Sequence, residues 1–386
     1  MKRIGVFTAT RAEFGLLRPV IAALETSRTL EPAVIVSGAH LSERHGLTVR
    51  DIQAEGVTIA ARVPVPLRSD RPVDIAADMA ATLKGCAETY AALDLDAVLM
   101  LGDRTELLAA AAAAVPFALP ILHLEGGHLT RGAVDDSIRH AVSKLAALHF
   151  TAAEPYRQRL IQMGEAPERV FTVGSTAADN LKAFGARTRA EVEAELGVDL
   201  SPGFLLATFH PETLGAMSPE AQIETFLAGL EIGRQGRKVL ITLPNTDAGS
   251  DAVRARIDAW AARNADGVTT RTSLGARRYL AALTACDAVA GNSSSGVIEA
   301  PIARIPCVNV GERQAGRLRP PGVIDTPLEA EAIATALSMA LNPEFRSATR
   351  AAPPPFGDGD AARRIVSVLE RTLFESLARK TSLVAK

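Results

Sequence analysis

The chain has 386 residues, of which 47% are hydrophobic and 22% are charged, and this length exceeds the size at which a single hydrophobic core usually stops growing. Its formal net charge is −2 and the basic residues are spread along the sequence, which excludes the footprint of a protein that binds nucleic acid or an anionic membrane. Two domains are therefore expected, and any polyanionic ligand should be small.

Cysteine usage and hydropathy indicate a cytoplasmic protein. Cys86, Cys286 and Cys307 are odd in number and far apart, which fits reduced thiols better than a disulfide framework or a metal site. The N-terminal MKRIGVFTATR passes directly into an apolar run, and no apolar stretch reaches the length of a membrane span. We expect no bound metal and no cofactor.

Short apolar runs alternate with longer helical patterns in the first half of the chain. Two of the helical patterns cover residues 74–93 and 134–148. The strand candidates are IGVFTAT (4–10), AVIVSG (33–38), AVLMLG (97–102), ILHLEG (121–126) and VFTVGS (170–175). This alternation predicts an α/β fold with parallel strands and right-handed crossovers.

A polar, helix-rich passage around residues 180–200 interrupts the alternation, which then restarts. The later strand candidates are FLLATFH (204–210), KVLITLPN (238–245), AVAGNS (288–293) and CVNVG (307–311). We predict two doubly wound α/β domains, residues 1–178 and 179–357, with the Pro- and Gly-rich segment 348–360 as a connector to an amphipathic helix. Open α/β sheets bind ligands at the carboxyl ends of their strands, so chemistry is expected in the loops that follow strands.

The stretch LEGGHLTRGAVDDSIRH, residues 124–140, places ionisable side chains where a strand ends and a helix begins. Glu125 ends the predicted strand, and the adjacent Gly126 and Gly127 allow the backbone to turn sharply. The predicted core face of the helix consists of Val134, Ile138, Ala141, Leu145 and Leu148, and its first two turns carry Asp135, Asp136, Arg139 and His140. These four charged side chains either form surface salt bridges at i,i+4 spacing, each worth about 0.3–0.5 kcal/mol, or belong to an acid–base site.

Two other strand ends in the first domain carry charges. Asp103 and Arg104 follow the strand 97–102, where a carboxylate is either a helix cap or part of a site. The first loop, TATRAEFG, supplies Arg11, and it lacks the GxGxxG pattern of a dinucleotide-binding turn.

The second domain offers groups suited to an anion. GNSSSGVIEA (291–300) follows a strand and opens a helix, so its hydroxyls and backbone N–H groups suit a diphosphate, while Glu299 suits a pair of ribose hydroxyls. His210 in FHPET ends a strand and could bind an anionic oxygen or shuttle a proton. Arg313 and Arg317 either lie on the surface or bind a nucleotide phosphate or base.

Taken in order, these motifs resemble the UDP-N-acetylglucosamine 2-epimerases, in particular the hydrolysing branch that feeds sialic-acid and legionaminic-acid synthesis. The matching stretches are TRAEFGLL, GDRTELLAAA, HLEGGHLTRGAVDDSIRHAVSKLAALHF, PYRQRLIQMGE, ERVFTVGS, FHPET, PNTDAGS, GNSSSGVIEAP and NVGERQAGR. The resemblance implies two Rossmann-like domains in the GT-B arrangement, with the C-terminal helix 358–382 packing back on the first domain. It also implies a homodimer and a nucleotide-sugar substrate.

The resemblance implies roles for individual residues. Asp103, Glu125 and Asp135, with His210, would be catalytic, in an elimination of nucleoside diphosphate across C1–C2 followed by addition of water. The residues expected to bind substrate or nucleotide are Arg11, Arg139, Asn245, Asn292, Ser293, Ser294, Ser295, Gly296, Glu299 and Arg313. The implied substrate is UDP-N-acetylglucosamine or a UDP- or GDP-linked 2,4-diacetamido-2,4,6-trideoxyglucose.

Two departures from the family pattern bear on this interpretation. Hydrolysing relatives commonly carry an acid directly after the glycine pair, where this chain has His128, and the carboxylate appears earlier, at Glu125. The first loop lacks the Lys of the non-hydrolysing relatives, which favours the hydrolysing branch. The alternative functions are a GT-B glycosyltransferase, a non-hydrolysing 2-epimerase and a non-catalytic nucleotide-sugar sensor.

Overall fold

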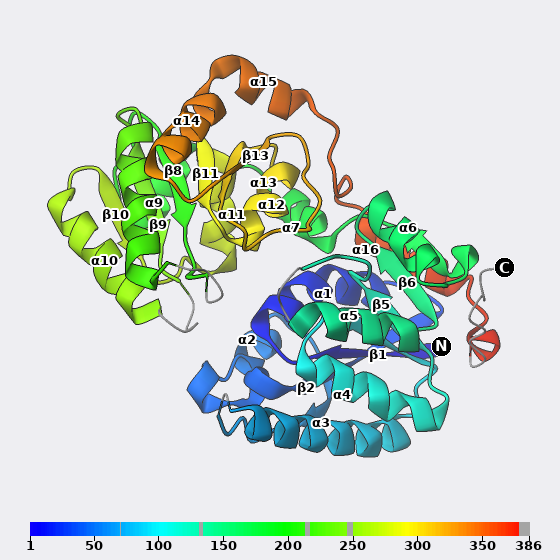
Figure 1. Cartoon of the computed structure of the whole chain (residues 1–386). Coiled ribbons are helices and arrows are strands. Elements are labelled where there is room, and N and C mark those ends of the chain that lie inside the picture. Colours follow the sequence, from blue (N-terminus) through cyan, green and yellow to red (C-terminus); the bar gives the residue numbers. More distant parts are fainter. Residues whose placement is uncertain (70, 131–133, 213–216, 245–249, 378–386) are drawn as a thin grey trace. The chain divides into compact units, whose positions relative to one another are not determined.

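The computed structural model describes residues 1–377 except 70, 131–133, 213–216 and 245–249. The described chain divides into two compact units: the first contains residues 1–180 and returns from residue 357 onward, and the second contains residues 181–356. Each unit is built around one parallel sheet (Figure 1).

The first unit contains a seven-stranded parallel sheet in the order β3-β2-β1-β4-β5-β6-β7. The strands are β1 (Lys2–Thr8), β2 (Leu30–Ser37), β3 (Ile59–Val63), β4 (Ala97–Leu101), β5 (Ile121–Leu124), β6 (Leu148–Thr151) and β7 (Val170–Thr172). The helices are α1 (Arg11–Glu25), α2 (Val49–Ala54), α3 (Pro72–Leu93), α4 (Thr105–Ala114), α5 (Val134–Leu145), α6 (Glu154–Gln162), α7 (Thr176–Phe184), which runs past the unit boundary, and α16 (Ala361–Glu370). The strand order is that of a Rossmann fold with one added strand.

Helices cover both faces of this sheet. Apolar side chains of α1, α2 and α16 pack in one core against one face, and those of α3, α4 and α5 pack in another core. The α16 helix is fixed at its start by Asp179, whose carboxylate accepts the backbone N–H groups of Ala361 and Ala362 at 3.0 and 2.9 Å. A carboxylate at a helix N-terminus satisfies N–H groups that have no partner within the helix.

The second unit contains a six-stranded parallel sheet in the order β10-β9-β8-β11-β12-β13. The strands are β8 (Phe204–Thr208), β9 (Lys238–Thr242), β10 (Val268–Arg271), β11 (Ala288–Gly291), β12 (Cys307–Val310) and β13 (Val323–Thr326). The helices are α8 (Arg189–Leu196), α9 (Pro219–Gly233), α10 (Ser250–Arg263), α11 (Gly275–Ala285), α12 (Ser294–Val297), α13 (Glu299–Ile302), α14 (Ala330–Leu341) and α15 (Pro343–Ala351). One core holds α9, α10 and α14, and the other holds α8, α11 and α13.

The predicted fold class of two Rossmann-like α/β domains is confirmed, whereas several element boundaries were wrong. The helix predicted over 134–148 ends at Leu145, and Leu148 begins β6. The predicted strand 4–10 ends at Thr8, because Thr10 caps α1 by accepting the Glu13 N–H while the Glu13 side chain reaches back to the Thr10 N–H.

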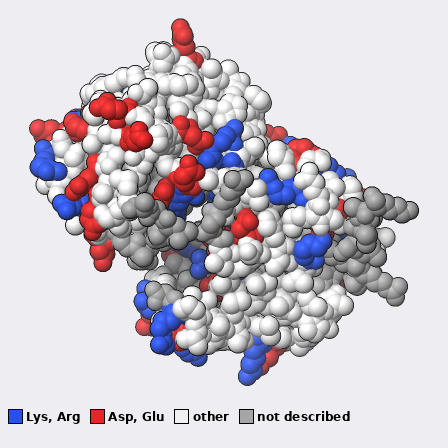
Figure 2. All heavy atoms as spheres, viewed as in Figure 1, with Lys and Arg blue, Asp and Glu red and all other residues white. Residues whose placement is uncertain are grey.

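Acidic and basic side chains both occur on the face of each unit shown in Figure 2. None of the helices in the described part of the chain combines the length and the apolar composition that a membrane crossing requires.

Candidate active site

The loops after β4 and β5 bring predicted acidic residues together in the first unit. Leu101 of β4 pairs with Leu124 of β5, so the chain leaves the sheet at the same edge toward Asp103 and toward Glu125. Parallel strands direct their carboxyl ends to one edge, which is why residues far apart in sequence become neighbours there.

Arg139 joins these loops to α5. Its guanidinium donates to the carboxylate of Asp103 and, at 3.1 Å, to Oδ1 of Asp136. The same group donates to the backbone carbonyl of His128 at 3.0 Å and to the Thr130 hydroxyl at 3.1 Å. The residue is only 3% exposed. A planar guanidinium offers several donors in fixed directions, so this one buried cation orients both loops.

The burial of Arg139 corrects the predicted orientation of α5. Val134, assigned to the core face, is 74% exposed, and the residues that the helix buries are Ile138, Arg139, Val142 and Ser143. The simple apolar periodicity gave the wrong face because a buried ionic network, and not only apolar packing, holds this helix. The interpretation of Arg139 as a surface salt-bridge residue is therefore wrong.

Glu125 and His128 form a hydrogen-bonded pair after β5. The Glu125 backbone is left-handed, with φ of 62°. One carboxylate oxygen, Oε2, lies 2.9 Å from His128 Nε2, and the other accepts the Ser175 hydroxyl at 2.9 Å. The His128 ring stacks on Tyr156 with 3.9 Å between ring centroids. Carboxylate, hydroxyl and aromatic ring together fix the position of the imidazole.

Gly127 is required by the tight packing of this loop. Its φ is 84°, and a Cβ placed there would lie 2.4 Å from the backbone oxygen of Tyr156. Arg159 donates to the Gly127 carbonyl, which ties the loop to α6. Any side chain at this position would move the backbone that presents Glu125 and His128.

Asp135 lies in the first turn of α5 and is exposed. The Asp135 carboxylate affects the pKa of Arg104. Burial alone would lower that pKa, but the nearby carboxylates of Glu106, Glu13 and Asp135 raise it above its ordinary value. Arg11 is the exposed first residue of α1, and within the described chain no hydrogen bond or ion pair joins it to Asp103 or Glu125.

The second unit contains a separate polar cluster at the ends of β8, β11 and β12. The buried Asn292 side chain accepts the backbone N–H of His210 and donates to its backbone carbonyl, both at 2.8 Å. The Asn292 carbonyl in turn accepts from Arg313 at 3.2 Å and from Gln314 at 2.9 Å. The structure thus brings the predicted residues His210, Asn292 and Arg313 into one network.

The predicted anion loop begins at the end of β11. Ser293 caps the short helix α12, and the Ser295 hydroxyl accepts a hydrogen bond from Tyr279 at 2.7 Å. Gly296 lies where a Cβ would come within 2.7 Å of Cys307 Sγ. Glu299, predicted one turn into the same helix, instead begins α13, because the backbone breaks at Ile298. Ser294 is the first residue of α12. Asn245 lies outside the described residues.

Several residues of these networks were not predicted from the sequence. Thr130 and Ser175 contact the acidic cluster, Gln314 contacts Asn292, and the Glu212 carboxylate accepts the N–H groups of Glu312 and Arg313 at 3.0 and 3.1 Å. Ser175 is the last residue of the predicted strand 170–175 and Gln314 comes three residues after the predicted strand 307–311, so closeness to a strand end is the one sequence signal that pointed to them.

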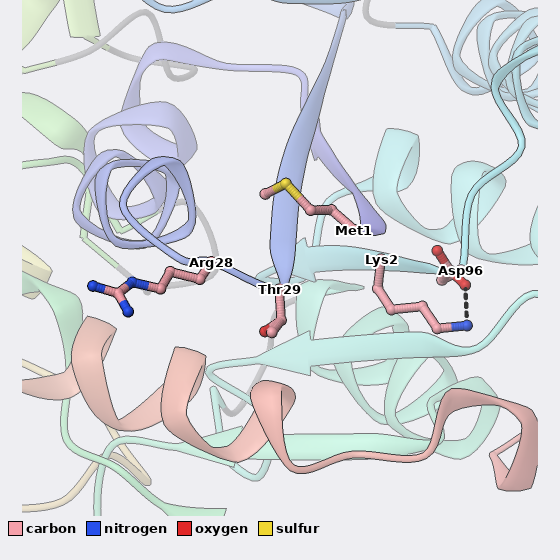
Figure 3. A pocket seen from close by; sticks show the side chains of 5 residues that line it. All are labelled: Met1, Lys2, Arg28, Thr29 and Asp96. Carbon is pink, nitrogen blue, oxygen red and sulfur yellow. Dashed lines mark ion pairs between the residues drawn. The ribbon is translucent and has the colours of Figure 1, made fainter.

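A surface depression near the start of the chain is not part of either cluster. It is lined by Met1, Lys2, Arg28, Thr29 and Asp96, and the ion pair between Lys2 Nζ and Asp96 Oδ1 measures 3.0 Å (Figure 3). These residues lie where β1, β2 and β4 begin, at the opposite ends of the strands from Asp103 and Glu125. No group of three or more His, Cys, Asp or Glu side chains suited to a metal ion occurs among the residues that the structure describes.

Two Rossmann-like units with polar networks at the carboxyl ends of their strands define the class of ligand-binding α/β proteins with paired Rossmann domains. The family model described as UDP-N-acetylglucosamine 2-epimerase matches residues 22–370. The chain belongs to this family.

Individual relatives place the chain in the hydrolysing branch. It is 34% identical over 327 residues to the GDP/UDP-N,N'-diacetylbacillosamine 2-epimerase (hydrolyzing) of Campylobacter jejuni, covering 85% of each chain. It is 34% identical over 372 residues to the UDP-N,N'-diacetylbacillosamine 2-epimerase (hydrolyzing) of Legionella pneumophila, covering 96% of each. The crystal structure of UDP-GlcNAc 2-epimerase from Neisseria meningitidis bound to UDP-GlcNAc matches with a TM-score of 0.81 and 18% identity, covering 96% of this chain and 100% of that one.

Proposed function

We propose that the protein converts a nucleotide-linked 2-acetamido sugar into the free 2-epimeric sugar and a nucleoside diphosphate. The observation that carries the proposal is the Arg139 network, which joins Asp103 to the loop that holds Glu125 and His128. The named activities of the Campylobacter and Legionella relatives support it. The candidate substrates are UDP-N-acetylglucosamine and UDP- or GDP-linked 2,4-diacetamido-2,4,6-trideoxyglucose.

The first step is an elimination. The hydrogen on C2 of such a sugar is not acidic, so it leaves as the C1–O bond breaks and positive charge develops on the ring. A base takes the proton, the C2–H electron pair forms the C1–C2 double bond, and the C1–O pair leaves on the diphosphate. Carboxylates near the ring stabilise the developing positive charge, which is why several acidic side chains are needed together.

The second step is a hydration, which leaves C2 with the configuration opposite to that of the substrate. Water loses a proton to a base and bonds to C1, while the double-bond electrons take a proton at C2 from an acid on the other face. We assign this acid–base work to Asp103, Asp135 and the Glu125–His128 pair. General acid–base catalysis of this kind usually contributes a rate factor of about 10² to 10⁴.

Residues of the second unit are assigned to the nucleotide. His210, Ser293, Ser294 and Ser295 offer donors for the departing diphosphate, together with Asn292, Gly296 and Arg313 around them. Glu299 is assigned to the ribose hydroxyls. In the first unit, Arg11 and Arg139 are assigned to substrate binding. Donors aimed at the leaving oxygen stabilise the charge that develops as the C1–O bond breaks.

We further propose that the enzyme acts in the cytoplasm as a homodimer and supplies a sugar for sialic-acid or legionaminic-acid synthesis. The similarity to the polysialic acid biosynthesis protein P7 of Escherichia coli, 30% identical over 370 residues, supports the role in sialic-acid synthesis. Sedimentation of the purified protein would test the dimer.

The test is incubation with each candidate nucleotide sugar in deuterated water, with nucleotide and sugar followed by NMR. The expected products are free nucleoside diphosphate and the 2-epimeric sugar carrying deuterium at C2. A nucleotide sugar epimerised at C2 but still intact would indicate a non-hydrolysing epimerase. Transfer of the sugar to an acceptor with protium kept at C2 would indicate a glycosyltransferase. Either result would contradict the proposal.

A further inference from the structure

His128 follows the glycine pair at the carboxyl end of β5, in the loop that also carries Glu125. Its Nε2 is 2.9 Å from Glu125 Oε2, and its ring stacks on Tyr156 with an interplanar angle of 24°. Only 9% of the side chain is exposed. The imidazole is thus held by Glu125 and by Tyr156, and a small part of it remains exposed to solvent.

The pairing with Glu125 determines where the imidazole carries its proton. An ionised carboxylate only accepts hydrogen bonds, so the neutral ring donates through Nε2 and holds its lone pair on Nδ1. Within the described part of the chain, the hydrogen bond of the His128 ring is the one that Nε2 makes with Glu125, and none is formed at Nδ1. This nitrogen is therefore a base whose lone pair accepts no hydrogen bond from the residues that the structure describes.

Glu125 is better placed to hold His128 than to take a proton itself. Its Oε2 is engaged by His128 and its Oε1 by the Ser175 hydroxyl at 2.9 Å, so both oxygens already accept hydrogen bonds. A negative partner on Nε2 stabilises the imidazolium that forms when Nδ1 takes a proton. This Ser–Glu–His chain has the arrangement in which a carboxylate orients a histidine base.

Charged side chains of both signs lie around His128. Arg139 donates to the His128 carbonyl, and Arg159 lies over the Tyr156 ring at 5.9 Å. Glu125 is the one anionic side chain that the structure places in direct contact with the ring. Removing its charge should therefore disfavour the imidazolium.

We infer that His128 takes the C2 proton of the sugar at Nδ1, with Glu125 and Ser175 as positioning residues; this rests on the proposed function. The C2–H bond breaks, its electron pair forms the C1–C2 double bond, and the C1–O pair leaves on the nucleoside diphosphate. The proton stays on Nδ1 as imidazolium beside Glu125. An imidazole is ordinarily a stronger base than a carboxylate, with a reference pKa of about 6.5 against about 4, which suits a carbon acid this weak.

The experiment compares wild type with His128→Gln, Glu125→Gln and the control His45→Gln, whose imidazole is exposed on the surface. Diphosphate release is measured from pH 5 to 9, together with nucleotide binding and thermal midpoint. His128→Gln should lower kcat by about 10²-fold or more while binding is kept. Glu125→Gln should also lower kcat while nucleotide binding is kept, because the imidazole loses the carboxylate that orients it. His45→Gln should behave as wild type.

Several results would overturn the assignment. One is His128→Gln with the wild-type rate, and another is Glu125→Gln with the wild-type kcat. Release of diphosphate by His128→Gln with accumulation of the unsaturated sugar would place His128 in the hydration and not in the elimination. Failure of wild type to release diphosphate from any candidate substrate would instead refute the proposed function, and the inference with it.

Discussion

Arg139 on α5 donates to the carboxylate of Asp103, 36 residues earlier in the chain, and so fixes the loop after β4 to the helix after β5. The same guanidinium binds Asp136 and the backbone of His128. Because the cation is buried while its carboxylate partners are about a quarter exposed, the network is both rigid and open to a ligand on its acidic side.

Arg139→Lys should impair both the fold and the reaction. A lysine has one compact ammonium and cannot donate along the four directions that the guanidinium serves. We expect a loss of stability of about 1–3 kcal/mol and a drop in kcat/KM of about tenfold or more. Chemical denaturation and steady-state kinetics check this, with Arg363→Lys, an exposed residue of α16, as the control. Equal kinetics for the two variants would show that the network does not position the site.

The acidic residues should separate binding from turnover. Asp103→Asn, Glu125→Gln and Asp135→Asn should each retain nucleotide binding and lose about 10²-fold or more in turnover, since each removes a proton carrier, its partner or a charge beside the sugar. Calorimetric titration with the nucleoside diphosphate and single-turnover rates measure the two effects. Asp258→Asn on the exposed side of α10 is the matched control. Wild-type turnover in all three variants would refute the assignment.

Asn292 should matter for the nucleotide side, because its side chain holds the His210 backbone through two hydrogen bonds of 2.8 Å. Asn292→Ala leaves both backbone groups without this partner. We expect nucleoside-diphosphate affinity to fall about tenfold, a change of about 1.4 kcal/mol. Asn264→Ala at the end of α10, which loses a hydrogen bond to the Trp260 carbonyl, is the control. Unchanged affinity in Asn292→Ala would contradict this role.

Glu13 should make stability depend on pH. Burial raises the pKa of Glu13 to about 7, although the backbone N–H groups of Ala9 and Thr10 and the charge of Arg104 act to lower it. Because the folded-state pKa lies above the unfolded value, the stabilising contribution is complete below about pH 4.5 and is lost as pH rises through about 7.

Replacing Glu13 by Gln removes the titrating group and keeps an acceptor for the α1 cap. Relative to wild type, Glu13→Gln should become progressively more stable as pH rises from 5 to 8, by as much as about 3 kcal/mol. Urea denaturation at each pH measures the difference. A constant difference between the two proteins across this range would show that Glu13 is ionised in the folded state throughout.

The alternation of apolar runs and helical patterns predicted the fold class correctly, because central strands such as 97–101 and 204–208 are fully or almost fully buried and therefore apolar. The strands that it missed include β3, β10 and β13, which lie at sheet edges and carry partly exposed polar residues. Apolar periodicity cannot mark a strand that is half in solvent. The missed β6 has a different cause, because its Leu148 extended the apparent periodicity of α5.

The candidate site was only partly predictable for a related reason. Strand ends can be read from the sequence, so it was possible to place Asp103, Glu125 and His210 at the carboxyl ends of strands. The partners Ser175 and Gln314, and the burial of Arg139, depend on which strands lie side by side, and local patterns carry no information about such contacts.

Elimination followed by hydration is tested most directly by incubating the enzyme with the preferred nucleotide sugar in water that contains deuterium and oxygen-18. Cleavage of the C1–O bond by elimination predicts a nucleoside diphosphate free of oxygen-18 and a 2-epimeric sugar carrying one deuterium at C2. Oxygen-18 in the diphosphate, or protium retained at C2 of the released sugar, would contradict the account.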